Sequence, residues 1–323
     1  MTEPVPPISP GGPSLPFTLR QIECFLAVAE SGSISRAAAR LNASDSAVSD
    51  AVSTMERALG AALFRRRRSR GATLTSDGAA ILPSVRRILT EGAELAASVG
   101  QGSHSIVGPV RIGCVGTLAG MLLPRLLIAV AERHPGIQLE YRIGDLTTLL
   151  SAAESGELDL VVTFDIGVPP EYERVALAET EAMLVVPAKH RLAGRERVSL
   201  TEVAEEPMVL LDIVSSRTHT LELMSARGIT PRIRHRTADY EFCRALVGRG
   251  LGFTLLMRRS VSTETWDGER VVYLPIDPPP RSVEVLIAWP AAPIPPRVGA
   301  VLDCAMGMRE AVAASMGGSN TTD

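Results

Sequence analysis

The chain of 323 residues has almost no lysine. Lys189 is the single lysine among 33 cationic residues, and the bias toward arginine extends over the whole chain. An arginine side chain suits bidentate recognition of phosphate and guanine. A bias this uniform is explained more simply by genomic base composition. The scarcity of lysine therefore does not by itself indicate a nucleic-acid partner.

Cysteine is also scarce, and no two cysteines form a Cys-x-x-Cys pair. The four of them lie in apolar or helical contexts and are Cys24, Cys114, Cys243 and Cys304. We therefore expect reduced, buried thiols in a cytoplasmic protein. The five histidines are isolated, so no pair has the spacing of a metal site, and we expect neither a metal nor another cofactor.

Long apolar segments are missing as well. The longest uncharged apolar stretch, residues 112–124, is too short to span a bilayer. Residues 1–16 contain six prolines and neither the basic nor the apolar segment of a signal peptide. We expect these residues to form a disordered leader on a cytoplasmic protein.

Common catalytic motifs are absent from the sequence. It contains no Gly-x-Ser-x-Gly, no Walker-type loop and no His-Glu-x-x-His. The glycine-rich segment 248–252 follows a predicted helix and precedes a strand, which is the wrong order for a phosphate-binding turn. We therefore expect the protein not to be an enzyme.

Charge is distributed unevenly along the chain. The overall formal charge is −3, but residues 17–100 hold 11 Arg and 8 acidic residues, a net of +3. Residues 101–323 hold 22 cationic and 27 acidic residues, a net of −5. A small basic module on a mildly acidic body fits a DNA reader joined to a domain that does not touch DNA.

Residues 17–75 have the pattern of a winged helix-turn-helix. Apolar residues recur at helical spacing in three segments, of which the third begins after Ser44 and ends at Gly60. Its predicted buried stripe is Val48, Val52, Met55 and Leu59. A run of arginines then precedes a strand-like segment at 72–74, which predicts a basic hairpin. We predict that this module binds double-stranded DNA.

The candidate DNA contacts lie on the polar face of the second and third helices and on the hairpin. They are Ser33, Ser35, Arg36, Arg40, Ser44, Asp45, Ser46, Ser49, Asp50, Ser53, Arg65, Arg66, Arg67, Arg68 and Arg70. An arginine run is usually a solvated face, but at a wing position it has phosphates as partners.

Residues 76–107 are predicted to be a linker helix followed by a hinge. Its apolar or small residues follow a 4-3-4-3-4 spacing, which indicates a seam that pairs with another helix. The seam consists of Ile81, Val85, Ile88, Gly92, Leu95 and Val99, and Pro83 is expected to kink the helix.

Residues 108–312 alternate between short apolar strands and helices, which predicts parallel sheets with helices on both faces. Strands are predicted at 110–115, 138–143, 158–164, 182–187, 208–211, 232–236, 253–256, 271–275 and 283–289. Helices are predicted at 118–133, 147–155, 216–227 and 241–248. Residues 313–323 are expected to be a disordered tail.

Several motifs of the chain resemble those of the LysR-type transcriptional regulators. In the first module they are Phe25-Leu26-Ala27-Val28-Ala29-Glu30, Ser33-Ile34-Ser35-Arg36-Ala37-Ala38, Ala47-Val48-Ser49, Leu59-Gly60-x-x-Leu63-Phe64 and Leu74-Thr75-x-x-Gly78. In the body they are Arg111-Ile112-Gly113, Leu123-Pro124, His134-Pro135-Gly136 and Gly156-Glu157-Leu158-Asp159-Leu160. The resemblance extends from Phe17 to about Arg309.

This resemblance implies an α+β multidomain fold: a winged helix-turn-helix, a linker helix and an effector-binding domain of the type II periplasmic-binding-protein kind. Its first lobe is expected at about 108–180 and 283–312, and its second at about 181–282. The implied function is transcription regulation in response to a small effector in the interlobe cleft. A homodimer through the linker helix, a homotetramer through the bodies and a contact with RNA polymerase are also implied.

The chain departs from the family pattern on the third helix. Asp45-Ser46 and Asp50 stand where the family usually has Gln-Pro and a basic residue. Asp45 is either a base reader, which would accept from a cytosine amino group, or a cap that points to solvent.

The candidate effector contacts follow strand ends, where α/β folds bind ligands. They are Thr117, Leu118, Thr163, Asp165, Ser215, Ser216, Arg217 and Thr218. Thr117 and the run from Ser215 open helices, whose first amides suit an anion. Arg217 suggests a carboxylate on the effector, and Asp165 a hydroxyl or amine.

Two other functions stay open. A small-molecule-binding protein or α/β enzyme with the same body would need an export signal or a catalytic constellation. A thiol redox sensor of the same family would need a reactive cysteine, for which Cys243 is the candidate, although it lies in the middle of a predicted helix.

Overall fold

The structure is a computed structural model that describes residues 15–67, 71–98, 106–257, 262–291 and 294–316. Within these ranges, the side chains of residues 66–67 and 93–98 are not described. The chain divides into two compact units, residues 1–103 with 155–157 and residues 104–154 with 158–323.

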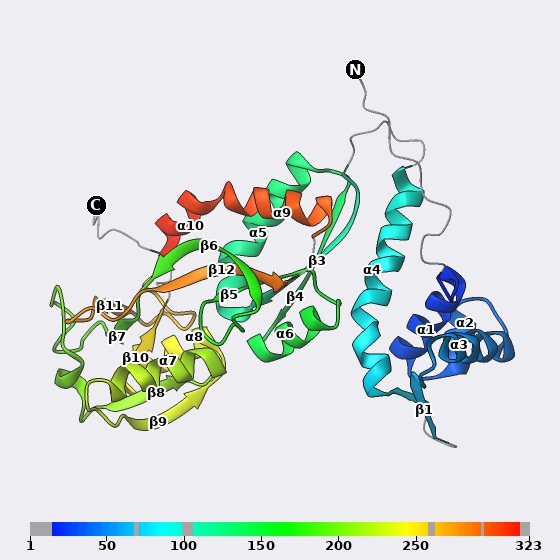
Figure 1. Cartoon of the computed structure of the whole chain (residues 1–323). Coiled ribbons are helices and arrows are strands. Elements are labelled where there is room, and N and C mark those ends of the chain that lie inside the picture. Colours follow the sequence, from blue (N-terminus) through cyan, green and yellow to red (C-terminus); the bar gives the residue numbers. More distant parts are fainter. Residues whose placement is uncertain (1–14, 68–70, 99–105, 258–261, 292–293, 317–323) are drawn as a thin grey trace. The chain divides into compact units, whose positions relative to one another are not determined.

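Three helices form the centre of the first unit: α1 (Leu19–Ser31), α2 (Ile34–Arg40) and α3 (Asp45–Leu59) (Figure 1). Hydroxyl side chains cap all three N-termini, because Thr18, Ser33 and Ser44 each accept a backbone N–H from the first turn. The left-handed glycines Gly32 and Gly60 end α1 and α3.

The buried faces of these helices enclose one apolar core. Phe25 and Phe64 lie at its centre, with their ring centroids 5.3 Å apart. The prediction of a buried stripe on α3 is correct for Val48, Val52 and Met55 but wrong for Leu59, which is 37% exposed. Leu59 is the last residue of α3, so it lies at the rim of the core.

The wing consists of β1 (Phe64–Arg67) and β2 (Gly71–Leu74), which pair antiparallel. Its attachment depends on two glycines, because Ala72 N donates to Gly32 O at 2.9 Å and a Cβ on Gly71 would lie 2.3 Å from the same oxygen. Gly71 also has a φ of 81°, a conformation that favours glycine. The wing therefore lies close against the turn between α1 and α2.

Helix α4 (Ser76–Ser98) follows the wing and contains Pro83. Its first turn lies against Leu63, because Thr75 N donates to Leu63 O at 3.0 Å and a Cβ on Gly78 would lie 2.3 Å from that oxygen. The carboxylate of Glu56 accepts from Leu63 N and Phe64 N. These contacts explain the Leu63-Phe64 and Thr75-x-x-Gly78 motifs as a junction of α3, β1 and α4.

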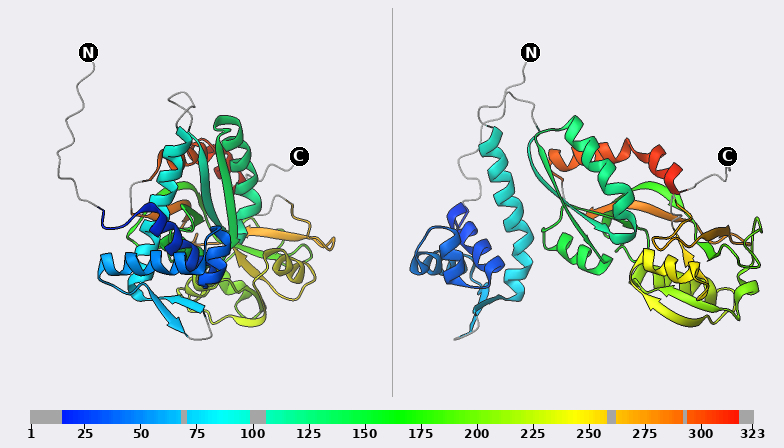
Figure 2. Two further views of the ribbon diagram at one scale, coloured as in Figure 1. Left: turned by 90° about the vertical axis from the view of Figure 1, so that its right-hand side faces the viewer. Right: turned by 180° about the vertical axis from the view of Figure 1, so that it is seen from behind.

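The second unit contains a five-stranded sheet with the order β4-β3-β5-β12-β6. Its strands are β3 (Gly108–Val115), β4 (Ile137–Gly144), β5 (Leu160–Phe164), β6 (Tyr172–Thr180) and β12 (Val283–Pro290). Helix α6 (Leu146–Glu154) covers one face (Figures 1 and 2). The opposite face carries α5 (Gly116–Arg133), α9 (Pro296–Met306) and α10 (Arg309–Met316).

A second group of strands comes from residues 183–275. β10 (Thr254–Leu256), β7 (Met183–Pro187) and β11 (Val271–Pro275) form a three-stranded antiparallel sheet. β8 (Pro207–Leu211) pairs parallel with β9 (Arg232–Thr237). The remaining elements of this part are η1 (Leu200–Val203), α7 (Val214–Ser225) and α8 (Tyr240–Gly248).

The structure corrects the sequence-based picture of the body in three places. The five-stranded sheet is mixed, since β12 runs antiparallel to β5 and β6 although β3 runs parallel to β4 and β5, and the three-stranded sheet is antiparallel throughout. The strand β6 was not predicted, because Glu and Arg side chains interrupt its apolar pattern. The predicted tail is helical up to Met316, where Val312 and Met316 are buried; residues 317–323 lie outside the described residues.

Candidate functional site

The exposed face of α3 is polar at its N-terminal end. Asp45, Ser46 and Asp50 are exposed, and Ser49 and Ser53 are half-buried. Ser44 caps the helix by accepting from Ala47 N at 3.2 Å, and its hydroxyl lies 3.0 Å from that of Ser46. Val48 and Val52 on the opposite side fix this orientation, because both are buried in the core.

Asp45 and Asp50 have different surroundings. The Ser35 hydroxyl donates to the Asp45 carboxylate, so this contact joins α2 to α3. Asp50 is exposed one and a half turns further along α3. Asp45 is therefore held by the protein itself, whereas the carboxylate of Asp50 remains directed to solvent.

The candidate cations of α2 also differ from each other. Arg40 forms an ion pair with Glu30 at 2.7 Å, which occupies part of its guanidinium. Arg36 is exposed close to Gly32, and its backbone N–H donates to the capping hydroxyl of Ser33. Ser33 thus has a structural role, and Arg36 is the more accessible of the two arginines.

The wing carries the arginine run. Arg65 is exposed on β1, and Arg66 and Arg67 belong to the same strand. The side chains of Arg66 and Arg67 are not described, and Arg68 and Arg70 lie outside the described residues. The strand pairing therefore confirms a hairpin at the predicted place, and Arg65 is exposed on it.

Part of the predicted seam of α4 packs against the core of the first unit, to which α4 belongs. Val85 is 3% exposed, and Ile81 and Ile88 pack against the core of the first unit. Val85 therefore cannot contact a second helix as the sequence pattern suggested. The side chain of Leu95 is not described and Val99 lies outside the described residues, while Ile88 and Leu89 remain half-exposed.

The second unit contains a small pocket, which we call the inner pocket. Its polar lining consists of Thr117, Ser216, His219, Thr220 and Tyr240. Its apolar lining consists of Phe164, Ala182, Leu211, Leu255, Leu256 and Met257. Apolar walls with a few polar groups are typical of small-molecule sites.

Two helices begin at this pocket without a side-chain cap. Val115 precedes α5 and Ile213 precedes α7, and neither side chain can accept a hydrogen bond from the first turn. Thr117 is the second residue of α5, and Ser216 is the third of α7. First-turn N–H groups that lack a cap favour an anion.

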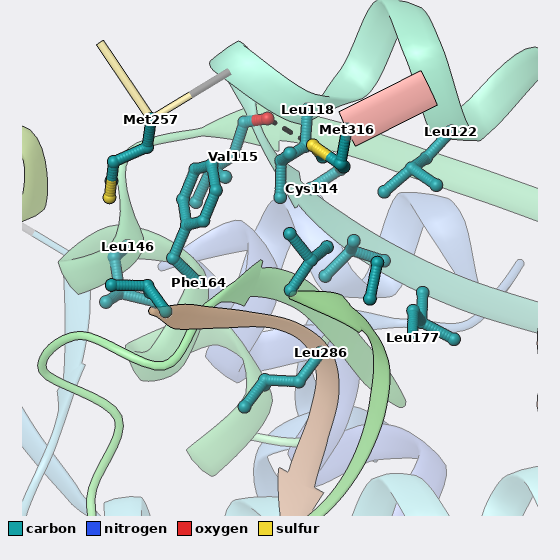
Figure 3. Close-up of a cluster of buried hydrophobic side chains, with 14 of the residues drawn as sticks. Cys114, Val115, Leu118, Leu122, Leu146, Phe164, Leu177, Met257, Leu286 and Met316 are labelled. Carbon is teal, nitrogen blue, oxygen red and sulfur yellow. Dashed lines mark hydrogen bonds between the residues drawn. The ribbon is translucent and has the colours of Figure 1, made fainter. Parts of the chain in front are cut away.

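Of the eight predicted effector contacts, the structure brings only Thr117 and Ser216 to the inner pocket. Leu118 lies instead in the buried cluster that holds Cys114 and Phe164 (Figure 3). Thr163 is 1% exposed and Ser215 is 9% exposed, and neither lines the pocket. Thr218 is exposed on the outer side of α7.

The two charged candidates have partners within the protein. Arg217 donates to Asp212 at 2.5 Å, and this pairing, helped by Arg236, lowers the pKa of Asp212. Asp165 accepts from Arg174 at 2.7 Å. Their places at a helix start and at a strand end suggested both residues as effector contacts. The sequence pattern does not reveal the ion pairs that they form.

His219, Thr220 and Tyr240 line the pocket and were missed by the sequence analysis. His219 and Thr220 follow Ser216 at helical spacing, and this spacing was the available signal. The Nε2 atom of His219 is buried without a hydrogen-bond partner among the described residues. Burial lowers the pKa of His219 below its ordinary value of 6.5, although Glu222 partly opposes this shift.

A wider hollow adjoins the inner pocket. It shares Thr117 and Tyr240 with that pocket and adds Arg125, Asp239 and Trp266, among others. Trp266 is 85% exposed. The hollow opens the region between α5 and α8 to solvent.

All four cysteines are buried and free. Burial raises the pKa of Cys114 to about 12 and that of Cys243 to about 11. The Cys243 thiol donates to Thr254 Oγ1 at 3.5 Å. A peroxide-reactive cysteine needs an accessible thiolate, and Cys243 has neither property.

The described residues contain no cluster of three His, Cys, Asp or Glu side chains that could hold a metal ion. Among them there is also no helix that is long and apolar enough to cross a membrane.

The fold defines a class of protein: a winged helix-turn-helix joined through a long helix to an α/β domain with a small-molecule pocket. Comparison with protein families identifies it further. The model described as "Bacterial regulatory helix-turn-helix protein, lysR family" matches residues 19–79, and the model "LysR substrate binding domain" matches residues 103–309. The chain belongs to the LysR family of transcriptional regulators.

Curated relatives agree with this family. The HTH-type transcriptional regulator ShiR of Corynebacterium glutamicum is 34% identical over 280 residues, which cover 84% of this chain and 92% of ShiR. The dual regulator OxyR of Escherichia coli is 28% identical over 280 residues, which cover 86% of this chain and 91% of OxyR.

Solved structures agree as well. HinK, a LysR family regulator of Pseudomonas aeruginosa, is 30% identical with a TM-score of 0.61 and covers 92% of this chain and 99% of its own. The C-terminal domain of a probable LysR family regulator from Rhodococcus sp. RHA1 is 38% identical with a TM-score of 0.61; it covers 62% of this chain and 99% of its own. The chain is thus a LysR-type transcriptional regulator with a DNA-binding unit and an effector-binding unit.

Proposed function

We propose that the first unit binds promoter DNA with the N-terminal half of α3 in the major groove and with the wing arginines on phosphates. The exposed face of α3, formed by Asp45, Ser46, Ser49 and Asp50 above a buried apolar stripe, supports this docking. Asp45 and Ser46 lie in the first turn, next to the cap Ser44, where helix-turn-helix proteins contact base edges. Arg36 and Arg65 supply the accessible positive charge.

Two variants test this assignment by electrophoretic or fluorescence titration of promoter DNA. Arg65→Ala should weaken binding to every sequence and lower the salt slope by about one phosphate contact. Arg57→Ala is the matched control, because Arg57 lies in the last turn of α3 and donates to Thr54. Equal effects of the two variants would place the wing away from DNA.

We further propose that a small effector with an apolar body and an anionic group binds in the inner pocket. The uncapped N-termini of α5 and α7 support the anionic group, and the apolar lining supports the body. Among the described residues, the inner pocket has no lysine or arginine in its lining. The helix N-termini would therefore offset the charge of the effector, rather than Arg217 as the sequence suggested.

The double variant Thr117→Val with Ser216→Ala tests the pocket through a promoter–reporter assay, with a panel of carboxylates as candidate inducers. The response to any inducing carboxylate should be lost while DNA binding persists. Thr218→Val is the matched control, since Thr218 lies on α7 but outside the pocket lining. A double variant that still responds normally would exclude this pocket as the effector site.

LysR-type regulators oligomerise, and for this chain we propose a homodimer through α4 and a homotetramer through the bodies. Ile88 and Leu89, which are half-exposed on α4, support the dimer. Effector-driven closure of the body would then change DNA bending and contact with RNA polymerase in the cytoplasm. Light scattering on the 34.4 kDa chain tests this assembly: a mass of one chain at micromolar concentration would contradict it.

A thiol redox sensor is the other candidate, and the relationship to OxyR favours it. The burial of all four thiols and the raised pKa values of Cys114 and Cys243 speak against it. We therefore retain the metabolite-responsive regulator. Loss of a peroxide response in a Cys243→Ser variant would reverse this preference.

A further inference from the structure

Asp50 is an exposed carboxylate in the second turn of α3. On a helix, the residues three and four positions away are the neighbours that a side chain can reach. For Asp50 these neighbours are Ser46, Ala47, Ser53 and Thr54, and none of them carries a positive charge. The favourable field of a helix N-terminus fades beyond the first turn. Helix α3 itself therefore does little to stabilise this charge.

The side chains that surround Asp50 on α3 are short. Between residues 44 and 54, every exposed or half-buried position holds serine, alanine, threonine or aspartate. The first long exposed side chain is that of Arg57, which donates to Thr54. A helix with such a face can approach the floor of a major groove closely. A side chain as short as that of aspartate can then reach the edge of a base.

The other polar side chains of this face cannot select a base in the same way. A serine hydroxyl both donates and accepts, so it pairs with either kind of base edge. Asp45 only accepts, like Asp50, but the Ser35 hydroxyl donates to its carboxylate and joins it to α2. Within residues 44–54, Asp50 is therefore the one acceptor-only side chain that no contact to another helix holds in place.

The base edges of the major groove differ in how they meet a carboxylate. Guanine presents two acceptors, and thymine presents an acceptor and a methyl group, so neither offers a donor. Adenine offers its N6 amino group, but the N7 acceptor beside it repels a negative oxygen. Cytosine offers its N4 amino group without such an acceptor. An acceptor-only side chain therefore favours cytosine over the other three bases.

We propose that Asp50 determines operator specificity by accepting a hydrogen bond from the amino group of a cytosine in the major groove. The inference rests on the proposed docking of α3 and adds to it the identity of one base pair, a C·G pair. With any other base at this position, the carboxylate loses water without gaining a donor. Cytosine should therefore be preferred by about five- to tenfold.

The experiment selects binding sites for the full-length protein from a library of randomised double-stranded DNA, followed by sequencing. The wild-type motif should contain a cytosine that depends on Asp50. In Asp50→Asn, the side-chain amide both donates and accepts, which matches N6 and N7 of adenine. The preferred base at that position should therefore change from cytosine to adenine. Titrations of two DNAs that differ only in this base pair should show that the order of affinities reverses.

Two further variants assign the change to this side chain. Asp45→Asn is the matched control, because it makes the same change of charge on the same helix at a carboxylate that Ser35 already holds. It should keep the preference for cytosine. Asp50→Ala should lose the preference without gaining one for adenine, since a methyl group neither donates nor accepts.

The outcomes separate this inference from the proposed docking. If Asp50→Asn and Asp50→Ala select the wild-type motif, or if Asp45→Asn makes the same change to adenine, the role of Asp50 is overturned. The docking of α3 and the wing still stands in that case if Arg65→Ala weakens binding. A wild-type protein that selects no motif from the library overturns both proposals.

Discussion

Asp50 adds a negative charge to the exposed polar face of α3, and no described side chain forms an ion pair with it. It is exposed, whereas the neighbouring carboxylate of Asp45 accepts the Ser35 hydroxyl. A free carboxylate in the groove repels phosphates, but it can also accept from a cytosine amino group. Asp45 therefore contributes mainly to the junction of α2 and α3, and Asp50 is the candidate base reader.

Replacing Asp50 by Arg should strengthen binding to DNA of any sequence and make it more salt-dependent. The change removes one negative charge and adds one positive charge, and each additional phosphate contact steepens the slope of log K against log salt by about 0.9. Titrations over a range of salt measure this effect. Asp50→Asn, which removes one charge at nearly constant shape, should have a smaller effect and should also lower any preference for cytosine at one position. An unchanged slope in both variants would place Asp50 away from the DNA.

His219 should make the second unit less stable in mild acid. Burial lowers the pKa of the folded ring, while the unfolded ring titrates near 6.5. Below that pH the unfolded chain binds more protons, so stability falls as the pH falls from 6.5 toward the folded pKa. Urea unfolding at about pH 7.5 and about pH 5.5 measures this loss. In His219→Gln the acid-induced loss should be smaller; an identical loss would mean that another group carries it.

At the scale of elements, the wing depends on close backbone contact rather than on side chains. Gly71 leaves no space for a Cβ, which would lie 2.3 Å from Gly32 O. The sequence motif Leu74-Thr75-x-x-Gly78 has a similar basis, since Gly78 lies against Leu63 O. Glycines in these motifs therefore set how α1, β2 and α4 meet.

Gly71→Ala should destabilise the first unit by about 1–3 kcal/mol, because it combines a strained φ of 81° with a backbone clash. Chemical unfolding followed by circular dichroism measures the loss. Gly92→Ala is the matched control: Gly92 lies in α4 with open space around it, so alanine should stabilise the helix by about 1 kcal/mol. A neutral Gly71→Ala would mean that the wing does not depend on this contact.

Elements with a clear period could be predicted, and those fixed by long-range packing could not. The apolar strands β3, β5 and β12 and the capped helix α3 were expected close to their observed places. Strand β6 was missed, because its buried residues alternate irregularly with Glu and Arg. Val85 followed the seam of α4 in sequence, but it faces the core of its own unit.

The residues of the candidate site also separate into those that the sequence could predict and those that it could not. Thr117 and Ser216 could be placed at helix starts from the sequence, and the structure brings them to one pocket. Arg217 was chosen for its place at the same helix start and Asp165 for its place at the end of a strand, but they pair with Asp212 and Arg174 and lie outside the pocket lining. Such pairings depend on distances between elements, which the spacing of residues along the chain does not encode.

At the scale of the whole molecule, two units carry two activities. Each unit has its own core: the first surrounds Phe25 and the second includes Ile112 and Leu184. A ligand stabilises only the unit to which it binds. In thermal unfolding, a carboxylate that acts as an inducer should therefore raise the transition of the second unit, and Gly71→Ala should lower that of the first alone. A single transition that shifts as one in both experiments would contradict independent units.

The most direct test of the central claim is binding of the purified protein to the DNA upstream of its own gene, compared with unrelated DNA over a range of salt. A LysR-type regulator that reads bases through α3 should bind the upstream DNA more tightly. Affinity for both DNAs should fall as salt rises, with a slope of about −0.9 per phosphate contacted. Equal affinity for the two DNAs, or binding that is indifferent to salt, would contradict the account.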